Sequence, residues 1–310
     1  MTYNEVTLED LAQSFGTTVD DIPEDCKSLV DKTDLHYRRL SSKERDKLML
    51  SILRTIEEDG LVASGQERLP QWERGWTENL QRFVDSNYKL EALIPKYIKT
   101  SQPVRLEHEY IMPCEANFEF YFTEAFRLWL FEKYLRAVDT IYEFGCGTGY
   151  NLTVLTKLFP NKKLYGLDWS EASQRILYEI VRVYGYNIEA RPFNFYSPDE
   201  GLEIVGSSAI ITFAALEQVG NNYEPFLQYI LKQSPVVCVN VEPLCELYDD
   251  GNLVDYLAIR YHKKRNYLNG YLSRLKELES GGEIEIVKVQ RLRFGNLYHE
   301  AYSYVVWKPK

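Results

Sequence analysis

Three glycines at alternate positions, with an acidic residue just before them, stand out in the stretch YEFGCGTGYNL at residues 142–152. Glycine has no Cβ atom, so its backbone can turn sharply and approach a ligand closely. A carboxylate at the same place would repel a pyrophosphate and suits a ligand with a positive end. We therefore expect this glycine turn to hold the cationic part of a ligand. Its candidate binding residues are Glu143, Gly145, Cys146, Gly147 and Gly149.

Two phosphate-binding motifs that also rely on glycine are not matched by the neighbouring residues. The dinucleotide fingerprint G-x-G-x-x-G requires glycine at position 150, where this sequence has Tyr150. The Walker phosphate loop requires Lys followed by Ser or Thr, and Asn151 and Leu152 do not supply that pair. The glycine turn therefore indicates a ligand without a pyrophosphate.

A second acidic residue strengthens this interpretation and indicates a particular cofactor. Asp168 ends the run LYGLD, 19 residues after Gly149, where a carboxylate can accept hydrogen bonds from both ribose hydroxyls. Trp169 follows it and offers an aromatic face to an adenine ring. The run FNFYS adds Asn194 and Phe195 after the next predicted strand. S-adenosylmethionine, which has an ammonium, a sulfonium and a ribose but no phosphate, matches this set of side chains.

The elements that would position these residues alternate between strand and helix from about residue 118 onward. Such alternation predicts a parallel sheet with helices on both faces, and a ligand lies where its strand order reverses. The last two strands are too close in sequence for a parallel crossover, so one of them should be antiparallel. The expected strands are residues 140–144, 163–168, 187–193, 208–213, 235–242, 283–289 and 301–307.

The N-terminal part, residues 1–115, has helical signals and almost no strand pattern. Ser41 and Glu44 form a capping box at the start of a run with helical spacing. Trp72 and Trp76 are four residues apart and share one helical face, which fits either a helical core or one wall of a substrate pocket. We expect a helical extension that forms a lid or substrate wall over the catalytic edge of the sheet.

The motifs YEFGCGTG, LYGLDWS and FNFYS, together with the closing strand pair, resemble class I S-adenosylmethionine-dependent methyltransferases. The resemblance implies a methyltransferase domain at residues 116–310. It also implies an α/β fold whose Rossmann-like, doubly wound, seven-stranded sheet is mostly parallel, with an antiparallel last strand.

The same resemblance assigns roles to the residues of the motifs. The three glycines would line the methionine part of the cofactor, with Glu143 near its amino group and Asp168 on its ribose. Asn194 departs from the pattern, because many members of the family have an aspartate toward the adenine amine at that place. An amide oxygen can still accept a hydrogen bond from that amine.

The acceptor decides whether a general base is required, because a hydroxyl usually needs one and an amine only has to be neutral. His299 is the first candidate, since it precedes the last strand and adjoins Glu300, which could fix its tautomer. His262 and Glu217 are the other candidates, and a structural role is the alternative for each. Glu217 and Glu242 follow the fourth and fifth strands and would either orient a hydroxyl or cap the next helix. No ligand spacing indicates a metal site.

The nature of the acceptor is only weakly indicated. The basic run RYHKKR, residues 260–265, fits either a solvated helix face or a clamp for an anionic substrate. The tyrosines of this stretch, Tyr256, Tyr261, Tyr267 and Tyr271, would suit a small organic ligand such as a sugar ring. The chain is also similar to bacterial methyltransferases that are associated with sugar and surface-polysaccharide O-methylation. The first hypothesis is therefore O-methylation of a sugar or glycan precursor.

Two other functions stay open at this stage. One is N-methylation of a small amine or a protein side chain, and the other is a non-catalytic scaffold that binds S-adenosylmethionine. The motifs of adenine or amide N-methyltransferases and of RNA cytosine methyltransferases are missing after the fourth and fifth strands.

Composition limits the compartment and the partners. With a net charge of −10 over 310 residues, the chain is a poor candidate for binding nucleic acid. No apolar run approaches the ~20 residues of a membrane helix, and the N-terminus does not resemble a signal peptide. The five cysteines are scattered, as is typical of reduced thiols. We therefore expect a cytoplasmic protein with a small-molecule partner, and the sequence does not indicate an oligomeric state.

Overall fold

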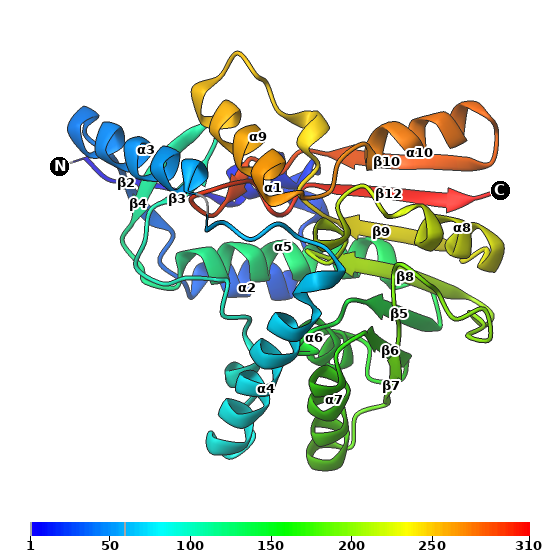
Figure 1. Cartoon of the computed structure of the whole chain (residues 1–310). Helices are drawn as coiled ribbons and strands as arrows, with labels where there is room; N and C mark the ends of the chain where they lie inside the picture. The colour runs from blue at the N-terminus through cyan, green and yellow to red at the C-terminus, as the bar shows by residue number, and fades with distance from the viewer. Residues whose placement is uncertain (1, 59) are drawn as a thin grey trace.

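The computed structural model describes residues 2–58 and 60–310, so Met1 and Asp59 of the expected N-terminal region lie outside the description. A seven-stranded sheet with helices on both faces forms the main body (Figure 1). The order of its strands is β10-β12-β9-β8-β5-β6-β7. Their bounds are β5 Thr140–Phe144, β6 Lys163–Asp168, β7 Ile188–Pro192, β8 Ser208–Phe213, β9 Val237–Val241, β10 Ile284–Gln290 and β12 Tyr304–Pro309.

The directions of the strands confirm the predicted topology. Strands β5 to β9 pair in parallel, whereas β12 is antiparallel to both of its neighbours, β9 and β10. From β5 the chain builds the sheet through β6 and β7 in one direction and then through β8 and β9 in the other. The strand order therefore reverses between β5 and β8, and ligands of open α/β sheets lie beyond the carboxyl ends of the strands at such a point.

Ten helices accompany the strands in the described part of the chain. The α-helices are α1 Leu8–Phe15, α2 Glu24–Asp31, α3 Ser42–Glu57, α4 Leu69–Asp85, α5 Phe118–Leu135, α6 Tyr150–Leu158, α7 Glu171–Tyr184, α8 Glu224–Gln233, α9 Leu253–Arg265 and α10 Tyr271–Ser280. Short 3-10 turns are η1 Val19–Asp21, η2 Gln66–Arg68, η3 Leu90–Leu93, η4 Leu216–Val219 and η5 Cys245–Leu247. The predicted capping box of Ser41 and Glu44 begins α3.

Alternating side chains divide the core into two layers. Ile141 and Ile211 pack with apolar residues of α5, α6 and α7. Tyr142 and Ile210, one position away in the same strands, pack with α8 and α10 on the opposite face. Each central strand is therefore buried on both sides, as expected for a parallel sheet.

The N-terminal region contains strands that the sequence pattern did not predict. A second, five-stranded sheet has the order β1-β2-β4-β3-β11. Each strand has five residues or fewer, which is too short for a period-of-two pattern to be clear. Two of its antiparallel neighbours, β3 at residues 104–106 and β11 at residues 294–295, are far apart in the sequence, so no local signal marks the sheet. Its bounds are β1 Asn4–Glu5, β2 His36–Arg39, β3 Val104–Leu106, β4 Glu109–Pro113 and β11 Phe294–Gly295.

The N-terminal region shares one hydrophobic core with the α/β body. Phe15 of α1 is fully buried, and its ring stacks on Trp129 of α5 with centroids 5.3 Å apart. Tyr304 of β12 donates a hydrogen bond of 2.8 Å to the backbone carbonyl of Phe15. Figure 1 shows the blue and cyan N-terminal elements on the side toward which the parallel strands point. The region thus adjoins the edge of the sheet where a ligand is expected.

Within the described residues, no helix is both long enough and apolar enough to cross a membrane.

Because the core is shared, replacing Phe15 should destabilise the whole protein. We expect Phe15→Ala to lower the free energy of unfolding by about 3–5 kcal/mol, since it leaves a cavity against α5. Tyr3→Ala is the control, because Tyr3 is 55% exposed, and it should change stability by less than about 0.5 kcal/mol. Denaturant unfolding followed by circular dichroism measures both. Two separate transitions, with only the smaller one shifted, would contradict a shared core.

Candidate functional site

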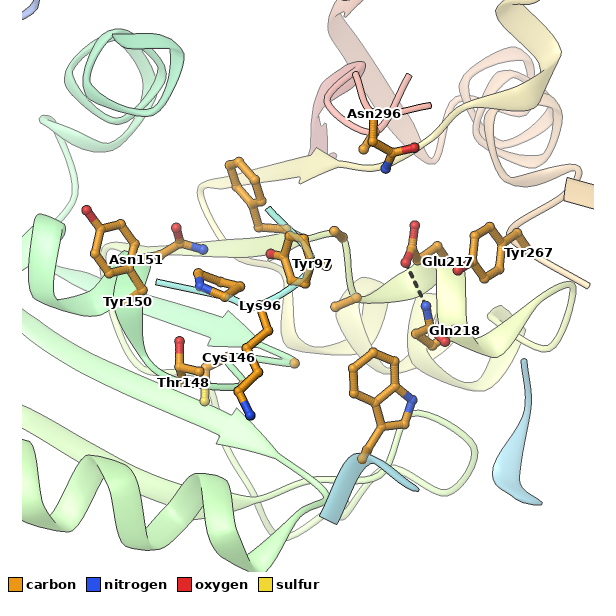
Figure 2. Close-up of a pocket in the computed structure, with 18 of the residues that line it drawn as sticks. Lys96, Tyr97, Cys146, Thr148, Tyr150, Asn151, Glu217, Gln218, Tyr267 and Asn296 are labelled. Atoms are coloured by element: carbon orange, nitrogen blue, oxygen red, sulfur yellow. Dashed lines mark hydrogen bonds between the residues drawn. The ribbon is translucent and has the colours of Figure 1, made fainter. Parts of the chain in front are cut away.

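A cavity of about 620 Å³ lies beyond the carboxyl ends of β5, β6 and β8, at the reversal of strand order. Figure 2 shows Cys146, Thr148 and Asn151 on one side of it, and Glu217 with Tyr267 on the other. The predicted residues that line it are Glu143, Gly145, Cys146, Gly147, Asp168, Trp169, Phe195, Glu217 and His299. The fold therefore brings most of the sequence-predicted site together.

The glycines of the turn contact different parts of the structure. Gly145, Gly147 and Gly149 have φ values of 74°, 52° and 70°, a region that side chains with a Cβ atom disfavour. A Cβ atom on Gly147 would lie 2.9 Å from the ring of Trp76, whereas one on Gly149 would lie 2.3 Å from Leu177 of α7. Gly149 is not among the residues that line the cavity, so the lining does not support its expected contact with the cofactor. This glycine is required for packing of the turn against α7.

Glu143 ends the central strand with its carboxyl group removed from water. It is 1% exposed, and Oε1 accepts a hydrogen bond of 2.7 Å from Asn151. Oε2 has no hydrogen-bond partner among the described residues. Burial raises the pKa of Glu143 to about 8, and the opposing effects of Asn151 and Arg127 do not offset it. The free protein therefore holds a protonated carboxyl at neutral pH that is ready to ionise beside a cation.

Asp168 is the second buried acid of the cavity. Its Oδ2 accepts a hydrogen bond from the backbone N–H of Gly147, and its Oδ1 accepts one from Ser170, both of 2.9 Å. Burial raises the pKa of Asp168 to about 6, while these backbone donors lower it. The group is thus mostly a carboxylate at neutral pH. Each oxygen can accept a further hydrogen bond, because a carboxylate has about four lone-pair sites.

The aromatic residues expected near an adenine ring are only partly at the cavity. Trp169 and Phe195 line it, and Trp169 stacks with Tyr196 at a centroid distance of 6.2 Å. Asn194 is exposed and lies outside the cavity lining, so the lining does not support its expected place at the adenine edge. Its side-chain oxygen accepts a hydrogen bond of 3.0 Å from the backbone of Tyr196, so it stabilises the local turn instead. Cys146 is buried, and burial raises its pKa well above the ordinary value, which keeps it a thiol.

The two histidine candidates form a buried pair. His299 lines the cavity, and its Nδ1 lies 3.0 Å from Nε2 of His262, which is not part of the lining. Glu300 was expected to orient His299, but it accepts hydrogen bonds of 2.7 and 2.9 Å from Arg291. The pairing of His299 with His262, 37 residues away, replaces that contact. His262 is 3% exposed, so it does not belong to a solvated helix face.

Both imidazoles are held in the neutral form. Burial lowers the pKa of His262 to about 3, with a further contribution from the charge of Arg105. Burial, and next the proximity of His262, lower the pKa of His299 well below its ordinary value. An exposed histidine has a pKa near 6.5, so burial of the pair moves the pKa of both rings below that value.

Glu217 begins the opposite wall of the cavity. Its Oε1 accepts a hydrogen bond of 2.6 Å from Gln218 (Figure 2), and its Oε2 has no partner among the described residues. Burial, and next the charge of Glu242, raise the pKa of Glu217 to about 8. Glu242 itself accepts backbone hydrogen bonds from residues 215–217, so it caps the turn η4. Glu242 therefore has a structural role, although the turn that it caps precedes it in the chain and is not the next helix.

Three cavity residues were missed by sequence reasoning. Arg127 of α5 donates a hydrogen bond of 2.6 Å to Asn151, which in turn bonds Glu143. Arg68 lines the opposite end and donates a hydrogen bond of 2.8 Å to Gln218. Asn151 could have been found, since a polar side chain one turn after the glycines faces the preceding strand end. Neither arginine has a local signal, because each comes from a helical run with ordinary composition.

The N-terminal region supplies part of the cavity wall. Trp72 and Trp76 of α4 line the cavity and stack on each other with centroids 5.4 Å apart. Between them in sequence, Glu73 accepts hydrogen bonds of 2.7 Å from Ser170 and 3.0 Å from Ala172 at the start of α7. The helix α4 is thus attached to the segment that follows Asp168, and the two tryptophans face the cavity, not a separate helical core.

Comparison with solved structures places this arrangement among known folds. The structure of the cyclase SpnF aligns with a TM-score of 0.54 at 10% sequence identity, covering 80% of this chain and 97% of that protein. At such low identity the likeness concerns the fold alone. It agrees with the strand order in assigning this chain the Rossmann-like α/β fold, whose sheet is mostly parallel with one antiparallel strand near its edge.

Structures described as methyltransferases are also similar. A SAM-dependent methyltransferase from Aquifex aeolicus aligns at 18% identity and a TM-score of 0.41, over 58% of this chain and 87% of that one. Magnesium protoporphyrin IX methyltransferase from Synechocystis PCC 6803, with bound SAH, aligns at 11% identity and a TM-score of 0.41. The alignment covers 86% of this chain and 98% of that one. The chain spans 59% of the length of LaPhzM, to which it aligns at 13% identity and a TM-score of 0.43. No protein-family model and no curated protein matches the sequence.

The buried histidine pair leads to a prediction about titration. We expect the imidazole signals of His262 and His299 to stay unchanged between pH 5 and 8, because their pKa values are lowered by burial to about 3 and well below 6.5, respectively. Two-dimensional NMR of the ring nitrogens measures this, with His262→Gln and His299→Gln for assignment. In unfolded protein the same rings should titrate near pH 6.5. A midpoint near 6.5 in the folded protein would disprove the neutral pair.

Proposed function

We propose that this chain is an S-adenosylmethionine-dependent methyltransferase that acts on a small molecule. The observation that carries the proposal is the placement of two buried acids, Glu143 and Asp168, beside the glycine turn in one cavity. A buried carboxyl oxygen without a partner is costly, so the free Oε2 of Glu143 suits a ligand with an ammonium group. The Rossmann-like fold supports the proposal by analogy only.

The residues of the cavity fit the parts of that cofactor. Glu143 would hold the amino group, Asp168 the ribose hydroxyls, and Trp169 with Phe195 the adenine ring. Bound here, S-adenosylmethionine would supply a methyl group made electrophilic by its sulfonium. Arg127 bonds Asn151 beside Glu143, so it stands near the place where the cofactor's own carboxylate belongs.

The N-terminal region would act as a lid and substrate wall. Trp76 approaches Gly147 closely, and Glu73 attaches α4 to the turn after Asp168. Apolar rings above the glycine turn would exclude water from the reacting atoms, which strengthens electrostatic interactions at the site. This function would belong to the described part of residues 1–115 that carries α4 and the segment up to Gln102.

A hydroxyl acceptor is the first choice for the substrate, with His299 as its base. His299 lines the cavity, and its Nδ1 is engaged by His262, which leaves Nε2 to accept a proton from a hydroxyl. Sugars and glycan precursors carry such hydroxyls, and their choice as substrate rests on the sequence resemblance alone. Glu217, protonated near neutral pH, would donate a hydrogen bond to the acceptor below pH 8.

One observation favours an amine acceptor as the second choice. Because the pKa of His299 is well below its ordinary value, the imidazole is a weak base. A neutral amine needs no proton removed before it attacks the methyl group. The two functions differ in the effect of His299→Gln, which should lower kcat at least tenfold for a hydroxyl acceptor and little for an amine. A cofactor-binding scaffold would form no S-adenosylhomocysteine with any acceptor in a metabolite panel, as measured by homocysteine release in an assay coupled to S-adenosylhomocysteine hydrolysis.

Cofactor binding should depend on both buried acids. We expect Glu143→Gln and Asp168→Asn each to weaken binding of S-adenosylhomocysteine at least tenfold, because each loses a charge-assisted hydrogen bond. Isothermal titration calorimetry measures the dissociation constants. Glu285→Gln on the exposed side of β10 is the matched control and should bind like the parent protein. Failure of the parent to bind S-adenosylhomocysteine would refute the cofactor assignment.

Proton release provides an independent test of Glu143. The free carboxyl has a pKa of about 8 and is protonated at pH 7, whereas a bound ammonium favours the carboxylate. Binding of S-adenosylhomocysteine at pH 7 should therefore release about one proton. Affinity should rise with pH up to about 8 and then level off, because Glu143 is already ionised in the free protein above that pH. Calorimetry in buffers of different ionisation enthalpy counts the protons, and Glu143→Gln should release fewer.

A further inference from the structure

We propose that the methyl acceptor is an anion whose carboxylate or phosphate group lies between Arg68 and Arg265 at the Glu217 end of the cavity. This inference rests on the proposed methyltransferase function and specifies its substrate class. Both arginine residues line the cavity and are more than nine-tenths buried, Arg68 at 7% and Arg265 at 9% exposure.

Neither arginine has an acidic partner among the described residues. No carboxylate of residues 2–58 or 60–310 lies within ion-pair distance of Arg68 or Arg265, although the other cavity arginine, Arg127, pairs with Glu124. Buried charges in proteins are generally paired, because removing an isolated charge from water is costly. Two unpaired guanidinium groups in one cavity are therefore the expected signature of a site for an anion.

The hydrogen bonds of the two side chains leave donors available. Arg68 donates to Gln71 at 3.1 Å and to Gln218 at 2.8 Å. Arg265 donates to the backbone carbonyl of Val62 and to the hydroxyl of Tyr267, and its buried Nε has no partner in the described chain. A planar guanidinium suits carboxylate and phosphate groups because its N–H donors form a fork.

The nearest acid does not neutralise this pair. Glu217 interacts with both arginines, yet burial and Glu242 raise its pKa to about 8, so it is mostly uncharged at neutral pH. Burial, and next the positive charge of Arg265, lower the pKa of Arg68, which places the two cations close enough to repel each other. An anion between them would relieve that repulsion and leave Glu217 as a hydrogen-bond donor.

This site shares only Arg265 with the predicted basic clamp at residues 260–265, and it is separate from the cofactor end. Of the run at residues 260–265, Arg265 and Tyr261 line the cavity, whereas Arg260 and Lys263 are exposed. The carboxylate of the cofactor has its own candidate in Arg127, next to Glu143. Arg68 donates a hydrogen bond to Gln218 and Arg265 donates one to Tyr267. Figure 2 shows Gln218 and Tyr267 on the same side of the cavity as Glu217.

The test uses the full chain saturated with S-adenosylhomocysteine and titrated with small probes. Benzoate and phenyl phosphate carry the two anionic groups, and benzamide is their neutral counterpart. We expect at least one anion to bind at least tenfold more tightly than benzamide, and the stronger of the two identifies the preferred group. Equal binding of benzamide and both anions, by calorimetry, would overturn the proposal.

Substitution of each arginine tests whether the anion binds at Arg68 and Arg265. Arg68→Gln and Arg265→Gln should each weaken the preferred anion at least tenfold while S-adenosylhomocysteine binds within twofold of the parent. Arg260 is an exposed arginine of the same helix as Arg265, so Arg260→Gln is the matched control. It should change neither the affinity for the anion nor the affinity for S-adenosylhomocysteine. If a glutamine variant does not fold, Arg68→Lys retains the charge without the fork and should show intermediate anion affinity.

The outcomes separate this inference from the proposed function. Anion affinity that is unchanged in both glutamine variants would refute the arginine site while leaving the cofactor assignment intact. A tenfold loss of S-adenosylhomocysteine affinity in both variants would show that the pair holds the cofactor's carboxylate, which also overturns the proposal. If the parent does not bind S-adenosylhomocysteine at all, the methyltransferase function itself fails.

Discussion

Glu143 is held at the end of the central strand where water hardly reaches it, and much of the surrounding structure follows from that position. A buried carboxylate without a partner is unfavourable, so the free protein keeps the group protonated and supports it through Asn151. Asn151 is oriented in turn by Arg127 of α5. The helix before the first strand of the sheet and the helix after the glycine turn are therefore both tied to one carboxyl group.

The cavity is closed by segments that are distant in sequence. Its floor consists of strand ends and the glycine turn, while Trp72 and Trp76 of the N-terminal region lie above that turn. The same region shares its core with α5 and β12 through Phe15. Because the wall of the cavity is continuous with a core element, the position of α4 depends on the packing of the whole protein as well as on its contacts at the site.

The two ends of the cavity differ in their electrostatics. At the glycine turn lie the carboxylate of Asp168 and the protonated Glu143, which can ionise beside a cation. Two basic residues of this end are already paired, Arg127 with Glu124 and Lys96 with Glu78. At the opposite end, Arg68 and Arg265 face a single acid, Glu217, whose pKa is raised to about 8. A cationic cofactor and an anionic acceptor would each find the complementary charge at its own end. This polarity would also orient the two ligands relative to each other, since charge complementarity contributes specificity.

Local patterns were sufficient to predict the sheet and most of the cofactor end of the cavity. The glycine turn and Asp168 could be placed because each follows a strand, and the carboxyl ends of parallel strands meet at one edge. The antiparallel strand β12 followed from the short connection before it. These inferences depend only on residues that are near in sequence to the element that positions them.

The tertiary structure alone decided how distant residues meet and which charges remain unpaired. His262 contacts His299, Arg127 reaches Asn151, and β11 pairs with β3, and none of these contacts has a signal in local spacing. Gly149 and Asn194 had the expected local setting, but the packing of Leu177 and the turn at Tyr196 gave them structural roles. Charge states also required the fold, because the pKa of a buried group is determined by its desolvation and neighbours, which a sequence does not specify.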